Sequence, residues 1–146
     1  MLTDEYRMFE LGSDGDTIRT ITRDFTPLPV TEVDMERARE QLESFIENGG
    51  NVDWSKIPSR KPATEEMDLD DEGNIWVRLV TTHEDRGHVF DVFDPIGRYL
   101  TTVRSDFAIA RFPPPIFRDG FMYAVTEDEL EVPYVVRARI EKPDRP

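Results

Sequence analysis

The sequence predicts an all-β fold of antiparallel strands with one inserted α-helix. Three observations support this fold class: a polar turn that ends in glycine and recurs, a regular spacing between copies of that turn, and strand-like runs that are apolar on both faces. The chain also has 9 Phe, 4 Tyr and 2 Trp, which is too many aromatic residues for a wholly disordered chain. We therefore expect the strands to enclose a packed core.

The recurring turn is the strongest internal signal. Each of its four copies places a glycine at the end of a mostly polar tetrad, just before a strand-like run, and the glycines are Gly15, Gly73, Gly97 and Gly120. In the tetrad 94–97, Asp at the first position, Pro at the second and Gly at the fourth match a type I turn. We expect Gly97 to adopt the left-handed conformation of a hairpin bulge.

The spacing of these turns predicts a repeat. Gly97 follows Gly73 by 24 residues, and Gly120 follows Gly97 by 23. Each interval has room for two strands, a tight turn and a longer loop, so two intervals form a four-stranded unit of about 47 residues, the size of a β-propeller blade. The interval from Gly15 to Gly73 is 58 residues, which leaves room for an insertion.

The insertion has the pattern of an α-helix over residues 31–48. Thr31 and Asp34 match a capping box, while Val30 and Met35 occupy the two positions of a hydrophobic staple. The run 48–50, Asn-Gly-Gly, is a stop signal. Apolar residues follow one another at helical spacing, and we expect them to be buried against the blade ends: Met35, Ala38, Leu42, Phe45 and Ile46.

The remaining elements are strands. We predict them over residues 5–9, 16–23, 63–69, 74–80, 88–93, 98–104, 115–118, 120–126 and 134–141. The runs 75–77, 89–93 and 134–136 are largely apolar on both faces, whereas a strand with one solvated face would alternate. Such strands suit sheets that are stacked between neighbours.

Two segments resemble a known repeat. Residues 71–77, Asp-Glu-Gly-Asn-Ile-Trp-Val, resemble the D-x-x-G-N-I-W-V run of NHL-like six-bladed β-propellers, and residues 90–100 resemble their F-D-P-x-G-x-(Y/F)-L run. The likeness extends weakly over 6–30 and 118–140, and the helix resembles an insertion seen in some bacterial members. The resemblance implies blades and does not imply a reaction.

We therefore expect one unit, 1–146, that is a partial β-propeller of about two and a quarter four-stranded antiparallel blades. In this interpretation 5–23 are the last two strands of one blade, 24–62 the helical insertion, 63–104 a complete blade, 113–141 three strands of a final blade, and 142–146 a tail. A closed propeller has at least about four blades, so the chain is interpreted as the C-terminal portion of a larger one.

The open blade faces predict self-association. In this interpretation Trp76, Phe90, Val135 and Val136 lie on blade faces whose neighbours the chain does not supply. Exposed strand edges and apolar patches favour pairing with other chains. We therefore expect the isolated chain to form an oligomer or to be a poorly stable monomer.

Charge and composition exclude several classes of partner. The net charge of −13 argues against a nucleic acid or an anionic membrane surface. No apolar run is long enough to span a bilayer, and the first residues do not form a signal peptide. Without Cys there is no disulfide or thiolate site, so the compartment stays open, and the family resemblance allows an extracytoplasmic bacterial parent. We expect no cofactor.

Three clusters of polar residues have a functional and a structural interpretation. His83 and His88 could bind a metal with nearby carboxylates, but their spacing on a loop favours a solvated segment. The acidic run 65–73 resembles a calcium loop, yet Leu79 stands where a bidentate Glu is needed, which favours a hairpin turn. Residues 31–72 carry 13 acidic and 5 basic side chains, either a solvated face or a docking surface for a basic partner.

We therefore expect a non-enzymatic scaffold that binds a protein or a small ligand. Successive strands run antiparallel, so the four glycine turns share one end of the sheets, and the other end collects 24–62, 81–87, 105–114 and 126–133. Long connections on a rigid scaffold are where binding residues usually lie. The alternative is a fragment of a metal-dependent propeller hydrolase or lyase, a class that the resemblance also includes.

Overall fold

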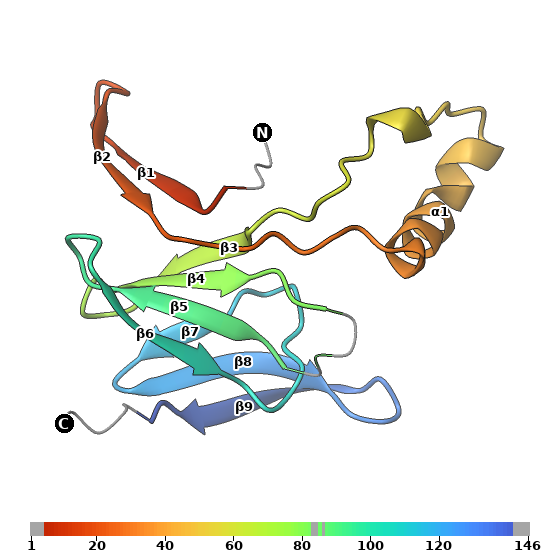
Figure 1. Cartoon of the computed structure of the whole chain (residues 1–146). Helices are drawn as coiled ribbons and strands as arrows, with labels where there is room; N and C mark the ends of the chain where they lie inside the picture. The colour runs from red at the N-terminus through yellow and green to blue at the C-terminus, as the bar shows by residue number, and fades with distance from the viewer. Residues whose placement is uncertain (1–4, 83–84, 86, 142–146) are drawn as a thin grey trace.

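The computed structural model describes residues 5–82, 85 and 87–141, so the predicted tail 142–146 lies outside the described residues. They form antiparallel sheets of two, four and three strands and one α-helix (Figure 1). The first sheet is β1 (Arg7–Leu11) with β2 (Thr17–Thr22), followed by α1 (Glu32–Glu47) and the short 3-10 helix η1 (Trp54–Lys56). The sheets do not close into a ring.

The other two sheets follow in chain order without crossovers. The second contains β3 (Thr64–Leu69), β4 (Ile75–Leu79), β5 (Val89–Phe93) and β6 (Tyr99–Arg104), and the third contains β7 (Ile116–Arg118), β8 (Phe121–Glu127) and β9 (Pro133–Arg139). Each predicted strand is present, with ends that differ by at most two residues. The second sheet lies between the other two in Figure 1.

The second sheet has a hydrophobic cluster on each face, as its doubly apolar strands predict. Towards the first sheet, the buried residues are Tyr6, Met8, Ile21, Ala63, Val77 and Phe93. Towards the third sheet, they are Trp76, Phe90, Val92, Ile109, Phe117, Met122 and Ala124. Val77 and Trp76 are neighbours in β4 and belong to opposite clusters, because successive side chains of a strand point to opposite faces.

Aromatic packing holds the second and third sheets together. The Trp76 and Phe117 rings stack with their centres 4.1 Å apart, and the Phe90 ring meets Phe117 edge-on at 5.5 Å. Trp76 is 4% and Phe90 is 1% exposed, so the expectation that both lie on open blade faces is wrong. Both rings pack against Phe117 of β7, so the third sheet of the same chain covers them. Val135, by contrast, is 71% exposed, and Val136 is half-buried.

Three of the four glycine turns share one geometry. Gly15, Gly73 and Gly97 have φ of 86°, 78° and 82°, and each backbone N–H donates to the carbonyl three residues earlier. This is the type I turn with a left-handed last residue that the sequence predicts for Gly97. In two copies an aspartate secures the turn: Asp70 accepts from the N–H groups of residues 72 and 74, and Asp94 accepts from those of residues 96 and 98.

The fourth turn differs. Arg118 pairs with Phe121 across only two residues, and both of those, Asp119 and Gly120, have positive φ, at 52° and 75°. Two positive φ values define a type I′ turn, which suits the right-handed twist of a two-residue hairpin. The connection between β8 and β9 contains a further type I turn with a left-handed last residue. Glu131, at φ 59°, takes the place of the glycine, and its N–H donates to the carbonyl of Asp128.

The helix stands apart from the sheets. Thr31 and Asp34 form the predicted capping box, but no residue of α1 is fully buried. Met35, Ala38 and Leu42 are half-buried, whereas Phe45 and Ile46 are 54% and 41% exposed. The expected burial against the blade ends is wrong because the connections before and after α1 hold it away from the strands (Figure 1). No helix in the described part of the chain is long and apolar enough to cross a membrane.

Candidate functional site

The two ends of the sheet stack differ in what they carry. The glycine turns lie together on the left of Figure 1, at what we call the turn end. The helical insertion and the connections around 80–82, 105–114 and 127–133 lie on the right, at what we call the loop end. Because long connections on a rigid scaffold carry most binding residues, the loop end is the candidate region for a binding site.

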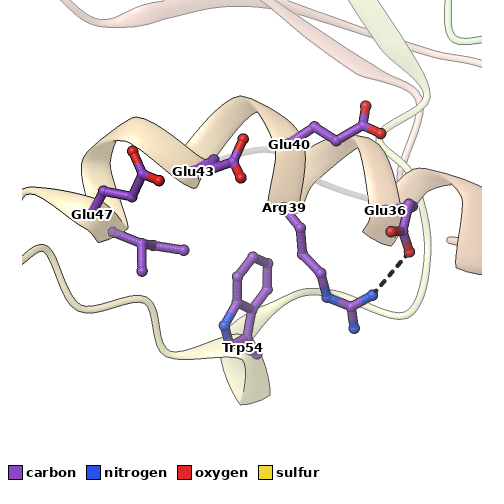
Figure 2. A pocket seen from close by; sticks show the side chains of 7 residues that line it. Glu36, Arg39, Glu40, Glu43, Glu47 and Trp54 are labelled. Atoms are coloured by element: carbon purple, nitrogen blue, oxygen red, sulfur yellow. Dashed lines mark hydrogen bonds and ion pairs between the residues drawn. The ribbon is translucent and has the colours of Figure 1, made fainter.

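The helix carries the strongest local negative charge of the loop end. Its glutamates follow one another at spacings of four, three and four residues, which places Glu36, Glu40, Glu43 and Glu47 on one face. With Arg39, Ile46 and Trp54 they line a groove of about 470 Å³ (Figure 2). The ion pair there, 3.4 Å between Arg39 and Glu36, is exposed, and such pairs contribute little. The groove is a solvated acidic surface.

Two extended segments, 28–30 and 59–61, join the insertion to the sheets, and we call them the neck. They run antiparallel: the Val30 backbone N–H donates to the Ser59 carbonyl at 3.0 Å, and the Lys61 backbone N–H donates to the Leu28 carbonyl at 2.7 Å. The Lys61 ammonium also lies 2.7 Å from the Asp34 carboxylate, and both side chains are largely buried. The neck therefore fixes the first turn of α1 beside the start of β3.

The capping aspartate is strongly held at this junction. Burial alone would raise the pKa of Asp34, but hydrogen bonds from Lys61 and Thr31 outweigh it and hold the pKa well below its usual range. The Thr31 N–H and hydroxyl each donate to Asp34 at 2.8 Å. The carboxylate is therefore ionised at neutral pH and ties the helix start to the neck.

A cleft of about 630 Å³ opens at the loop end, between the start of α1, the neck, β3, β4 and the connections that follow them. We call it the loop-end cleft. The described residues that line it are Asp34, Arg37, Lys61, Pro62, Thr64, Glu65, Glu66, Arg78, Val80, Thr81, Thr82, Asp85, His88, Ile109 and Arg111. They include four cationic side chains and four carboxylates, so the cleft is close to neutral in a chain whose net charge is −13.

Arg78 is the most unusual residue of the cleft. Its side chain is 3% exposed, and its Nη1 lies 3.3 Å from Glu66 and 4.0 Å from Glu65. Its Nε and Nη2 atoms are buried and have no hydrogen-bond partner among the residues that the structure describes. A buried donor without an acceptor is costly, particularly on a charged group. The described residues therefore leave these two nitrogens of the guanidinium without a hydrogen-bond acceptor.

The neighbouring ionisable groups respond to Arg78. Burial and the charge of Arg78 lower the pKa of His88, so this imidazole is neutral at physiological pH. Burial raises the pKa of Glu65, although Arg78 opposes the shift. Asp85 is engaged locally, since it accepts from the Thr82 N–H and hydroxyl at 3.0 and 2.9 Å.

The structure does not bring the predicted metal candidates together. Among the described residues there is no group of three or more His, Cys, Asp or Glu side chains that could hold a metal ion. His83 lies outside the described residues, while His88 lines the cleft. In the acidic run, Asp70 is occupied as a turn acceptor and also accepts from the Trp76 indole N–H at 3.0 Å. The tight turn predicted for that run is present.

A second buried charge joins the first two sheets. Asp91, in β5, is 1% exposed, forms an ion pair with Arg23 and accepts from the Thr102 hydroxyl at 2.6 Å. The Arg23 guanidinium lies over the Tyr99 ring, 4.1 Å from its centre. Burial and the negative charge of Asp91 raise the pKa of Tyr6. These contacts join residues of the first two sheets, while the Tyr6 hydroxyl and the Asp91 Oδ2 atom are buried with no hydrogen-bond partner among the described residues.

Sequence reasoning missed both buried charges. Arg78 and Asp91 interrupt runs that are otherwise apolar on both faces, Ile75–Leu79 and Val89–Phe93. A single charge in such a run has no solvated face to occupy, and that is the signal that could have identified both residues.

Comparison with protein-family models, curated proteins and solved structures found no match for this chain.

Proposed function

We propose that this chain is a non-enzymatic binding module, in which propeller-type blades stacked face to face form a scaffold and the loop end binds a protein or a small ligand. The observation that carries the proposal is the loop-end cleft, whose walls come from the insertion, the neck, the second sheet and the segment around Ile109. Walls drawn from separate segments give a scaffold the means to combine several side chains around one ligand.

The scaffold part of the proposal rests on how the sheets are stacked. A four-stranded sheet with a hydrophobic cluster on each face, between partial sheets of two and three strands, is the arrangement that stacked blades require. The outer face of the third sheet carries the Phe121 and Tyr123 rings and the exposed Val135, and it has no described neighbour. A further blade, or another copy of the chain, would cover this face in the propeller arrangement.

The binding part is tested with a library of small organic fragments and amide chemical-shift mapping on the full chain. The expected result is that shift changes concentrate on cleft residues such as Thr64, Thr81 and Ile109. Fragments that perturb only the turn end, or only the outer sheet faces, would overturn the assignment of the loop end.

A pair of matched variants controls for indirect effects. Thr64→Trp fills the cleft from its β3 wall, and Ser13→Trp adds the same bulk to an exposed position of the first turn. We expect Thr64→Trp to abolish the fragment-induced shifts and Ser13→Trp to leave them unchanged. Equal effects of the two variants would contradict the proposal.

The scaffold part is tested by sedimentation over a range of protein concentrations. We expect reversible association that is abolished by Val135→Lys, because a lysine on the outer face opposes stacking. A monomer at all concentrations that unfolds cooperatively above about 60 °C, beyond most mesophile domains, would contradict it.

A further inference from the structure

We infer that the loop-end cleft binds a small organic carboxylate, which the Arg78 guanidinium holds through its Nε and Nη2 atoms; this inference rests on the proposed function. Those two donors lie on one edge of the planar guanidinium, side by side. A carboxylate presents two oxygens at the matching separation and accepts two parallel hydrogen bonds. Within the described part of the chain this buried pair of donors has no acceptor, so it is the half of a bidentate contact that a carboxylate could complete.

The described residues supply no acceptor for this edge. Glu66 and Glu65 approach the guanidinium at Nη1, at 3.3 and 4.0 Å, which is the other side of the group. The Glu66 Oε2 atom is itself buried and accepts no hydrogen bond, so this contact is an ion pair with poor geometry. Both glutamates come from β3, where Glu66 lies opposite Arg78 in the strand pairing and Glu65 lies at the register shift between Thr64 and Glu66.

The remaining lining favours a monoanion with an organic body. Arg111 is an exposed cation at the rim, and Lys61 is a largely buried cation already paired with Asp34. Pro62, Val80 and the buried Ile109 give the same cleft apolar wall. Because Glu65 and Glu66 lie beside Arg78, a second negative charge on the ligand would be repelled. A carboxylate therefore fits better than a phosphate dianion.

The test observes the Arg78 Nε–H signal of the full-length chain by nitrogen-15 NMR during titrations with benzoate, benzamide and inorganic phosphate. We expect benzoate to move this signal saturably. Benzamide keeps the ring and loses the charge, and it should bind at least tenfold more weakly, as should phosphate. Tighter binding of phosphate than of benzoate would overturn the carboxylate assignment.

Two substitutions define the contact. Arg78→Lys keeps the charge and removes the planar edge, so benzoate affinity should fall at least tenfold, whereas Arg118→Lys at the turn end should leave it unchanged. Arg111→Gln, at an exposed position, should weaken benzoate two- to threefold. If Arg78→Lys does not fold, the titration of the wild-type chain followed at the Arg78 Nε–H signal is the deciding test. Saturable binding of benzoate, seen at other signals, that leaves the Nε–H signal unmoved would overturn the inference.

Failure of this inference and failure of the proposed function give different results. Fragments that bind the cleft with no preference for a carboxylate would remove the inference and leave the loop end as the binding surface. A loop end that binds neither benzoate nor any other fragment would remove both.

Discussion

The second sheet and helix α1 are both strongly patterned in the sequence, yet the sheet is buried on both faces and the helix has no fully buried residue. In β5 every residue is buried, including Asp91. In α1 the best-placed apolar residues are half-buried at most. Periodicity thus determines that an element forms and which of its faces is apolar. Whether that face is buried depends on a complementary surface elsewhere in the chain. The second sheet has such a surface on both sides, whereas α1 has only the short segment around Trp54 that follows it.

Removing an aromatic ring from the second sheet should have the largest effect. Phe90→Ala deletes a ring that is 1% exposed and that meets both Trp76 and Phe117 edge-on. We expect a loss of about 3–5 kcal/mol in the free energy of unfolding, measured with urea. Phe9→Ala, at a residue that is 54% exposed, serves as the control and should cost less than about 1 kcal/mol. Similar losses would mean that the Phe9 ring is packed as tightly as the Phe90 ring, despite its exposure.

Two glycines with the same backbone conformation separate packing from strain. Gly97 and Gly49 have φ of 82° and 87°, but a Cβ at Gly97 would lie 2.6 Å from the Ile21 side chain, whereas one at Gly49 would meet nothing within 4 Å. We expect Gly49→Ala to cost about 1 kcal/mol from strain alone, and Gly97→Ala about 2–3 kcal/mol because the clash adds to it. Thermal and urea unfolding of both variants check this difference, and equal losses would contradict it.

Acid should weaken the start of the helix through Asp34. The folded-state pKa of Asp34 is lowered, so its ion pair and cap stabilise α1 fully above the unfolded pKa of about 4, and this stabilisation is lost as pH falls from there towards the folded value. Asp34→Asn should remove about 1 kcal/mol at neutral pH and flatten the acid dependence of the helical circular dichroism signal. Glu36→Gln, on the exposed groove, is the control. An unchanged acid profile in Asp34→Asn would show that another group controls the helix.

The smallest effect is expected at the tip of the insertion. Phe45 is 54% exposed, and its ring rests on Gly50 rather than on a sheet. Phe45→Ala should lower the unfolding free energy by about 0.5 kcal/mol or less. Urea unfolding of the isolated chain measures this loss. A loss above about 2 kcal/mol would show that the ring is packed in solution, against another copy, and that α1 and the second sheet differ less in burial than the structure shows.

The parts of this fold that local rules govern could be predicted. The strand ends follow from the Asp and Gly positions of the turns, and the helix start follows from Thr31 and Asp34. The Asp119-Gly120 turn was mistaken for a longer one, because a polar tetrad ending in Gly is compatible with either geometry until the strand pairing is known.

The cleft could not be predicted because it depends on distant pairs. Arg78 matters through the glutamates of β3, through Ile109 and through the neck, which are brought together only by the sheet register and the insertion. The sequence shows a lone cation in an apolar strand, but it does not show which of its donors are left without an acceptor. The same holds for Asp91, whose partner Arg23 is far away in the chain.

The neck makes the insertion separable from the sheets. Because Pro29 and Arg60 are bridged, the chain leaves the sheet stack and returns to it at adjacent points. A two-residue turn could therefore close that gap in place of residues 31–58, and the strands on either side would keep their spacing. The same adjacency makes this position a graft point, where another domain with close termini could be exchanged for the helix. Such an exchange would also replace Asp34 and Arg37 on one wall of the cleft, so the inserted segment determines part of the cleft lining.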